Sequence, residues 1–127
     1  MLVPHNYLPF EFKENDKIIN DWKKLIRSSE FTLGTYVDRF ENAFAKFIGT
    51  KYCISTNSGT DALILCLKSL GIKKDDEIIT VSNTFYATAG AIVACGAIPV
   101  FVDCDSRYQI DEKLIEKAIT KKTKVIM

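Results

Sequence analysis

Short apolar runs alternate with helical patterns from residue 52 to residue 127, and this alternation constrains the fold more than any other feature. The runs at 78–81 and 98–102 are continuous and rich in β-branched residues, which is typical of strands buried on both faces. Between them, apolar residues recur at helical spacing. A strand, a crossover helix and a second parallel strand form a right-handed βαβ unit. The sequence therefore predicts an α/β fold with a mostly parallel sheet flanked by helices.

The predicted elements follow one another without an internal repeat. An arm at 1–12 and amphipathic helices at 14–28 and 36–48 precede the alternating region. The aromatic stripe of the second helix predicts a core face, made by Val37, Phe40, Phe44, Phe47 and Ile48. The predicted strands are 52–56, 78–81, 98–102 and 124–127, and the predicted helices between them are 62–70, 85–95 and 112–120. Gly49, Gly71 and Gly96 are expected to end helices.

Charge is balanced along the chain, with 17 basic and 16 acidic residues and a formal charge of +1. Neither sign forms a long block, so the sequence lacks the signature of a protein that binds nucleic acid or an anionic membrane. The longest apolar segment, 87–102, is interrupted and is shorter than the roughly 20 residues of a spanning helix. The first residues lack the order of a signal peptide. We expect a cytoplasmic protein without nucleic-acid or membrane partners.

The potential metal ligands are scattered. The cysteines, Cys53, Cys66, Cys95 and Cys104, lie far apart without a CxxC pair. We expect them to be reduced and buried rather than part of a disulfide or zinc set. The single histidine, His5, lies in a proline-containing leader, where a surface role is expected. The sequence therefore predicts no metal site.

The turn at 57–61 joins the first predicted strand to the helix after it. Such a glycine-containing turn leaves unpaired N–H groups and the positive end of the helix dipole facing one small space. That space can hold a phosphate. Alternatively, Ser58 or Thr60 only caps the helix. The local pattern leaves both interpretations open.

A second strand-to-helix turn, at 82–86, carries the aromatic pair Phe85 and Tyr86. In a parallel sheet, both turns belong to the carboxyl edge, where ligands of such sheets lie. An anion site beside an aromatic face fits a flat phosphorylated ring. The fingerprints GxGxxG and GxxxxGK[ST] are both missing, so the turn does not look like an NAD or ATP site.

Several short segments carry a family resemblance across nearly the whole chain. They are LGTYVDRFE at 33–41 with Ala45 and Gly49 after it, SGTDAL at 58–63, DEII at 76–79, TF at 84–85, GAIPVFVD at 96–103, ID at 110–111 and ITKKT at 119–123. In this order they resemble the DegT/DnrJ/EryC1/StrS family of pyridoxal-phosphate-dependent sugar aminotransferases. Each segment alone is weak evidence, but the order of all of them is specific.

The resemblance implies part of a fold-type I large domain that binds pyridoxal 5'-phosphate. It implies an arm and helix at 1–34 and the partial cofactor domain at 35–127. Gly59, Thr60 and Asp61 match the segment that holds the cofactor phosphate, and Phe85 matches the aromatic that stacks on the pyridine ring. Tyr7 and Thr32 fall where family members approach the sugar nucleotide. As a core residue, Phe85 would instead be buried.

The resemblance also implies an activity that this chain cannot perform by itself. The family's ring-nitrogen aspartate and its Schiff-base lysine, in a Ser-x-x-Lys segment, fall beyond the position equivalent to Met127. None of Lys51, Lys68, Lys73 and Lys124 lies in such a motif. We therefore expect the full-length protein to be a homodimeric aminotransferase that moves an amino group from glutamate to a keto-sugar nucleotide. The 127-residue chain alone is expected to be inactive.

Two further hypotheses stay open at this point. The chain could be a non-catalytic binding or interaction module that retains the fold, or a generic nucleotide-binding α/β domain. A reading frame that continues into a Ser-x-x-Lys segment would remove the first. Comparing the binding of pyridoxal phosphate with that of NAD and ATP would test the second.

Overall fold

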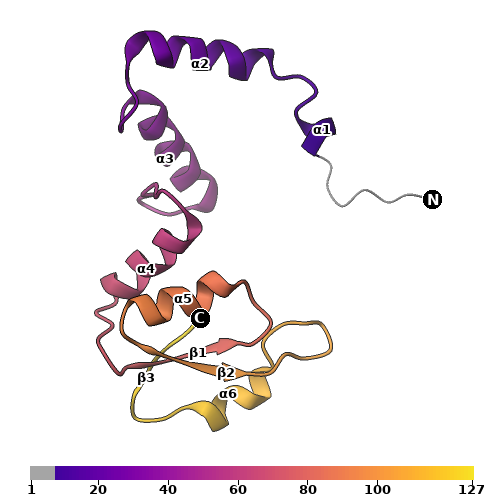
Figure 1. Ribbon diagram of the computed structural model, residues 1–127, viewed down its shortest axis with the longest axis vertical. Helices are drawn as coiled ribbons and strands as arrows, with labels where there is room; N and C mark the ends of the chain where they lie inside the picture. Colours follow the sequence, from indigo (N-terminus) through magenta and orange to yellow (C-terminus); the bar gives the residue numbers. More distant parts are fainter. Residues whose placement is uncertain (1–7) are drawn as a thin grey trace, which may run out of the picture. The chain divides into compact units, whose positions relative to one another are not determined.

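The computed structural model describes residues 8–127, which divide into one unit up to Ser55 and one from Thr56 onward (Figure 1). The domain boundary predicted between residues 34 and 35 stays a prediction. The first unit contains α1 (Leu8–Glu11), α2 (Asp16–Ser28) and α3 (Thr35–Ile48). The second contains α4 (Gly59–Ser69), β1 (Glu77–Val81), α5 (Tyr86–Ala94), β2 (Ile98–Val102), α6 (Glu112–Ala118) and β3 (Thr123–Ile126).

Local chemistry sets both ends of α3. Gly34 has φ 113°, which favours glycine, and it precedes the first residue of the helix. Glu30 Oε2 accepts hydrogen bonds from the Thr35 hydroxyl at 2.8 Å and from the Thr35 N–H at 3.2 Å. These bonds hold the pKa of Glu30 below its ordinary value. The helix ends at Gly49, which has φ 81° and donates its N–H to the Ala45 carbonyl, as predicted.

The predicted core face of α3 is wrong for this unit. Phe40, Phe44 and Phe47 are all exposed, and Phe47 retains 83% of its accessible surface. Phe40 and Phe44 stack on each other with ring centroids 5.5 Å apart. Ala45 is the only fully buried residue of α2 and α3. The helical period was predicted correctly, but no apolar layer among the described residues of this unit covers the stripe.

The second unit is built on a parallel three-stranded sheet with the order β2-β1-β3. Ile79 of the central strand lies opposite Val100 of β2, and Pro99 is on the edge strand, where a missing ladder donor is tolerated. The connection through α5 and the connection through α6 run across the sheet in opposite directions. Right-handed crossovers therefore place these helices on opposite faces, as Figure 1 shows. The predicted α/β fold is confirmed.

The core of this unit lies between β1 and the helices α4 and α5. It consists of Leu67, Ile78, Ala91, Ile92 and Ala97. Thr80, on β1, is also completely buried, and its Oγ1 has no hydrogen-bond partner in the described part of the chain. An unpaired buried hydroxyl is destabilising.

The predicted strand at 52–56 is not a strand. It pairs with no strand of the described residues, and a strand needs a partner for its backbone groups. The Ser55 N–H instead donates to Glu41 Oε1 at 2.6 Å. Tyr52 and Ile54, both apolar in the pattern that predicted the strand, are exposed.

The four cysteines are free thiols, as predicted, but none of them is fully buried. Cys66 is exposed, and the other three are half-buried. Apolar neighbours in sequence did not ensure burial, since even Cys66, within α4, is exposed. Among residues 8–127, no helix has both the length and the apolar character needed to cross a bilayer.

Candidate functional site

Helix α4 begins at Gly59 rather than at Ala62, and Ser58 caps it. Ser58 Oγ accepts a hydrogen bond from the Asp61 N–H at 3.1 Å, and the Ser58 carbonyl accepts one from the Ala62 N–H at 3.1 Å. The N–H groups of Gly59 and Thr60 precede the first bond of the helix and have no intrahelical partner. The cap therefore satisfies one donor of the first turn and leaves two for an anion. The two interpretations of this turn are compatible.

Gly59 leaves open space at this helix start. A Cβ built on Gly59 would meet no atom within 4 Å, and its φ lies outside the left-handed region. Neither packing nor backbone strain therefore requires glycine here. Because Cα–Cβ bonds tilt toward the N-terminus of a helix, a side chain at this position would project into the space before α4. The residues present fit a phosphate that approaches the backbone closely.

The Asp61 carboxylate is engaged with the cap. Its Oδ2 accepts the Ser58 hydroxyl at 2.9 Å, while the Asp61 N–H donates back to the same hydroxyl oxygen. An ionised carboxylate has no proton to donate, and it repels a phosphate dianion. The contacts of Asp61 therefore hold Ser58 and the turn in place, and its part in the phosphate site stays a prediction.

Phe85 is at the N-cap position of α5, and its ring faces solvent. It retains 68% of its accessible surface, so the alternative that it is a core residue is wrong. Its ring centroid lies 4.4 Å from that of Tyr86, with the planes tilted by 51°. An exposed aromatic face at a helix start can stack on a planar ligand.

The turn that carries Phe85 lies at the carboxyl edge of the sheet. It follows β1 directly, and the Ser82 N–H donates to the Val102 carbonyl at the end of β2, at 3.0 Å. Helices α4 and α5, which begin at the two candidate turns, pack side by side (Figure 1). The convergence of Gly59 and Phe85 on one pocket stays a prediction.

The loop at 103–111 follows β2 at the same edge and is closed by Asp105. The Asp105 carboxylate accepts the N–H of Arg107 at 2.9 Å and the N–H of Gln109 at 3.2 Å, and it pairs with the Arg107 guanidinium at 2.7 Å. The Arg107 side chain holds the pKa of Asp105 below its ordinary value. Tyr108 has φ 62° and is exposed. Its carbonyl accepts the Asn83 side chain at 3.4 Å, which links this loop to the turn of Phe85.

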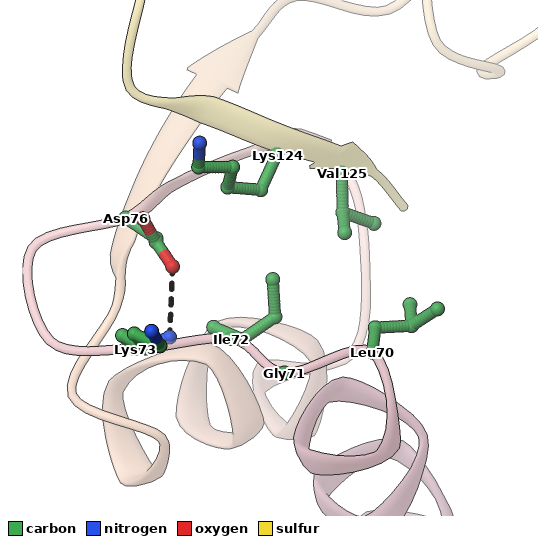
Figure 2. A pocket seen from close by; sticks show the side chains of 7 residues that line it. All are labelled: Leu70, Gly71, Ile72, Lys73, Asp76, Lys124 and Val125. Carbon is green, nitrogen blue, oxygen red and sulfur yellow. Dashed lines mark hydrogen bonds between the residues drawn. The ribbon is translucent and has the colours of Figure 1, made fainter.

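A cavity of about 480 Å³ lies at the opposite edge of the sheet (Figure 2). Its lining residues are Leu70, Gly71, Ile72, Lys73, Asp76, Lys124 and Val125. Asp76 immediately precedes β1 and accepts the Lys73 N–H at 2.8 Å, so the cavity lies at the amino ends of the strands. Ligands of parallel sheets bind at the carboxyl ends, and we do not assign the site to this cavity.

The part assigned to the two residues predicted to approach the sugar nucleotide stays a prediction. Thr32 is exposed in the connector between α2 and α3, in the first unit. Tyr7 lies outside the described residues. The link made by Asn83 could not be predicted from the sequence. Its partner is 25 positions away, and no local pattern reveals such a pair.

Comparisons with known proteins show the family to which this chain belongs. The profile of the DegT/DnrJ/EryC1/StrS aminotransferase family matches residues 13–127. The chain belongs to this family. The predicted resemblance is confirmed, and the match includes both candidate turns.

Relatives in this family aminate sugars, according to their names. The chain is 43% identical over 113 residues to UDP-2-acetamido-2-deoxy-3-oxo-D-glucuronate aminotransferase from Pseudomonas aeruginosa, covering 88% of this chain and 32% of the relative. It is 40% identical over 123 residues to dTDP-3-amino-3,4,6-trideoxy-alpha-D-glucose transaminase from Micromonospora megalomicea subsp. nigra, covering 96% and 33%. The chain thus spans about a third of the length of these relatives.

A solved family structure supports both the fold and the cofactor. NtdA from Bacillus subtilis, with bound cofactor PMP (pyridoxamine phosphate), superposes with a TM-score of 0.89 at 34% identity. The superposition covers 99% of this chain and 30% of NtdA. PMP and pyridoxal phosphate are two forms of one cofactor. The prediction that the family uses this cofactor is confirmed.

Proposed function

We propose that this chain forms the phosphate-binding and ring-stacking part of a pyridoxal-phosphate-dependent aminotransferase. The observation that carries the proposal is the start of α4, where two N–H groups face the open space left by Gly59. The exposed ring of Phe85 supplies a second, independent contact. When bound, pyridoxal phosphate supplies an electron-accepting ring that carries an amino group between two substrates.

The residues of the two turns have distinct parts in this proposal. The N–H groups of Gly59 and Thr60 bind the phosphate, supported by the positive end of the α4 dipole. Asp61 contributes through Ser58, which it holds in the capping position. Phe85 covers one face of the pyridine ring and limits its rotation. These residues bind and orient the cofactor.

The proposal also names the two substrates. We infer that the acceptor is a keto-sugar nucleotide and the donor is glutamate, which agrees with relatives named for UDP- and dTDP-linked sugars. Tyr7 and Thr32 are proposed to contact the sugar nucleotide. The test is amino transfer from glutamate to a keto-sugar nucleotide by the full-length gene product. Equal rates with and without the keto sugar would contradict the assignment.

The cofactor site can be tested directly with a matched pair of glycines. Gly59 and Gly90 are both helical, and neither has an atom within 4 Å of a built Cβ. Gly→Ala at either position should raise the free energy of unfolding by up to about 1 kcal/mol, because alanine has the higher helix propensity. Only Gly59→Ala should also weaken the binding of pyridoxal phosphate, by about tenfold or more, since a methyl group blocks close approach of an oxyanion.

Equilibrium dialysis with pyridoxal phosphate, NAD and ATP gives the required comparison. The parent protein should prefer pyridoxal phosphate to both nucleotides. Equal losses in Gly59→Ala and Gly90→Ala would place the phosphate elsewhere. Preference for ATP or NAD would support a generic nucleotide-binding domain instead.

The assembly of the protein is a further part of the proposal. We infer a cytoplasmic homodimer, which agrees with the free thiols and with the exposed aromatic residues of α3. Sedimentation velocity at several concentrations measures the assembly. A protein that stays monomeric at the highest concentration would contradict this part.

A further inference from the structure

The ring of Phe85 is not held in place by the core. Its side chain is largely exposed, and its ring contacts the equally exposed ring of Tyr86. The orientation of Phe85 therefore depends on the backbone of the turn at 82–85. A stacking residue must be preorganised to bind its ligand with full affinity.

That turn has three local supports. The Ser82 N–H bonds to the end of β2, and the Thr84 N–H bonds to the Ser82 carbonyl at 3.1 Å. The hydroxyl groups of Thr84 and Thr88 are 2.9 Å apart, which joins the turn to the first turn of α5. These contacts define both ends of the turn and leave the Asn83 side chain free to bond outside it.

Asn83 connects the turn to the loop at 103–111. Its Nδ2 donates to the Tyr108 carbonyl at 3.4 Å, a long hydrogen bond. The acceptor is well fixed, since the Tyr108 N–H bonds to the Asp105 carbonyl at 3.0 Å and residues on both sides bond to the Asp105 carboxylate. The loop is also closed by pairing between Cys104 and Ile110. Asn83 is thus tied to a rigid partner.

We propose that Asn83 is a positioning residue for Phe85, acting through its bond to the loop at 103–111. The inference rests on the proposed function, because it assigns Phe85 to the face of the cofactor ring. The hydrogen bond of the Asn83 side chain goes to the loop at 103–111 and not to the first turn of α4. Its effect should therefore be confined to the ring of the ligand.

Binding of two ligands, each with a phosphate group, distinguishes a positioning role of Asn83 from a general role in stability. Pyridoxamine phosphate carries both the ring and the phosphate, whereas inorganic phosphate tests only the α4 site. Asn83→Ala and Asn83→Asp both remove the donor. Each should weaken pyridoxamine phosphate binding by about two- to tenfold, the range for loss of one neutral hydrogen bond, and leave the affinity for inorganic phosphate unchanged.

A substitution within the loop at 103–111 and a matched control complete the experiment. Asp105→Ala removes the acceptors that close the loop and should give the same selective loss. Asn42→Ala is the control, since Asn42 is also exposed and donates to a backbone carbonyl, that of Asp38, at 2.8 Å in the first unit. It should change neither affinity.

The possible outcomes are distinct. Unchanged pyridoxamine phosphate binding in the Asn83 variants overturns the inference and leaves the proposed function intact. Equal loss of both ligands also overturns it, because Asn83 would then support the whole unit. If the parent protein binds neither ligand, the proposed function fails, and the inference fails with it.

Discussion

The two units of the chain differ in how far their apolar residues are buried. In the second unit, apolar residues of β1, α4 and α5 enclose one another, and Ile78, Ala91 and Ile92 are completely buried. In the first unit, α2 and α3 carry more pronounced apolar stripes than α4 and α5, yet Ala45 is the only buried residue of these two helices. An amphipathic stripe predicts that a face will be covered, but it does not say what covers it.

This difference indicates where the chain offers surface to other molecules. Contiguous exposed apolar residues on soluble proteins mark interaction surfaces. The first unit displays Phe40, Phe44 and Phe47 in this way, with ring centroids 5.5 Å and 6.4 Å apart along the stripe. The second unit exposes the aromatic residues of its carboxyl edge, where a ligand is proposed to bind, and also aliphatic residues of its helices such as Leu65 and Val93. The following predictions test whether the contrast holds in solution.

The largest difference is expected between a core residue and a stripe residue. Ile92→Ala should lower the free energy of unfolding by about 2–5 kcal/mol, because it removes buried methyl groups and leaves a cavity. Phe47→Ala should change it by no more than about 0.5 kcal/mol, since the ring is exposed. Urea denaturation followed by circular dichroism measures both. A large, concentration-dependent loss in Phe47→Ala would show that an assembly buries this stripe.

A smaller effect of opposite sign is expected at the buried hydroxyl of the sheet. Thr80→Val keeps the shape of the side chain and removes an unpaired polar atom, so it should stabilise the protein by about 1 kcal/mol. Thr50→Val is the control in the first unit, because its hydroxyl donates to the Tyr52 carbonyl at 3.0 Å and is exposed. It should be neutral or slightly destabilising. Destabilisation by Thr80→Val would mean that the hydroxyl has a partner.

The smallest effect is expected in the pH dependence of the start of α3, in the first unit. The start of α3 depends on Glu30, whose pKa is lowered by its bonds to Thr35. A lowered pKa in the folded state means that the stabilisation is present above the ordinary value of 4.5 and is lost as the pH falls through the folded-state pKa. Glu30→Gln retains an oxygen acceptor that does not titrate.

Circular dichroism from about pH 6 to about pH 3 should therefore show a loss of helix that is smaller in Glu30→Gln than in the parent. Asp21→Asn is a matched control on α2, in the same unit. Its ion pair with Lys24 is solvent-exposed and should contribute little. Identical titrations of the parent and Glu30→Gln would show that Glu30 does not stabilise the start of α3.

Several features could be predicted because their causes lie within a few residues. Gly49 and Gly96 follow helices with positive φ, as expected of left-handed caps. Ser58 caps α4 through the N–H three residues later. The strands at 78–81 and 98–102 were correct almost to the residue, because a continuous β-branched run has few alternatives.

Other features could not be predicted because their causes are distant in sequence. The segment at 52–56 has a strand pattern and no strand beside it among the described residues. Phe40, Phe44 and Phe47 have the spacing of a core face and are exposed. The bond from Asn83 to Tyr108 joins two loops that only the sheet brings together.

The sequence alone determined the helices and strands from α4 to β3, several helix caps, the α/β class and the family. Each of these follows from local backbone preferences and from short segments in a fixed order. Tertiary structure alone decided which apolar faces are buried and which loops touch. Burial requires a second surface opposite the first, and a residue's own neighbours in the chain do not specify that surface.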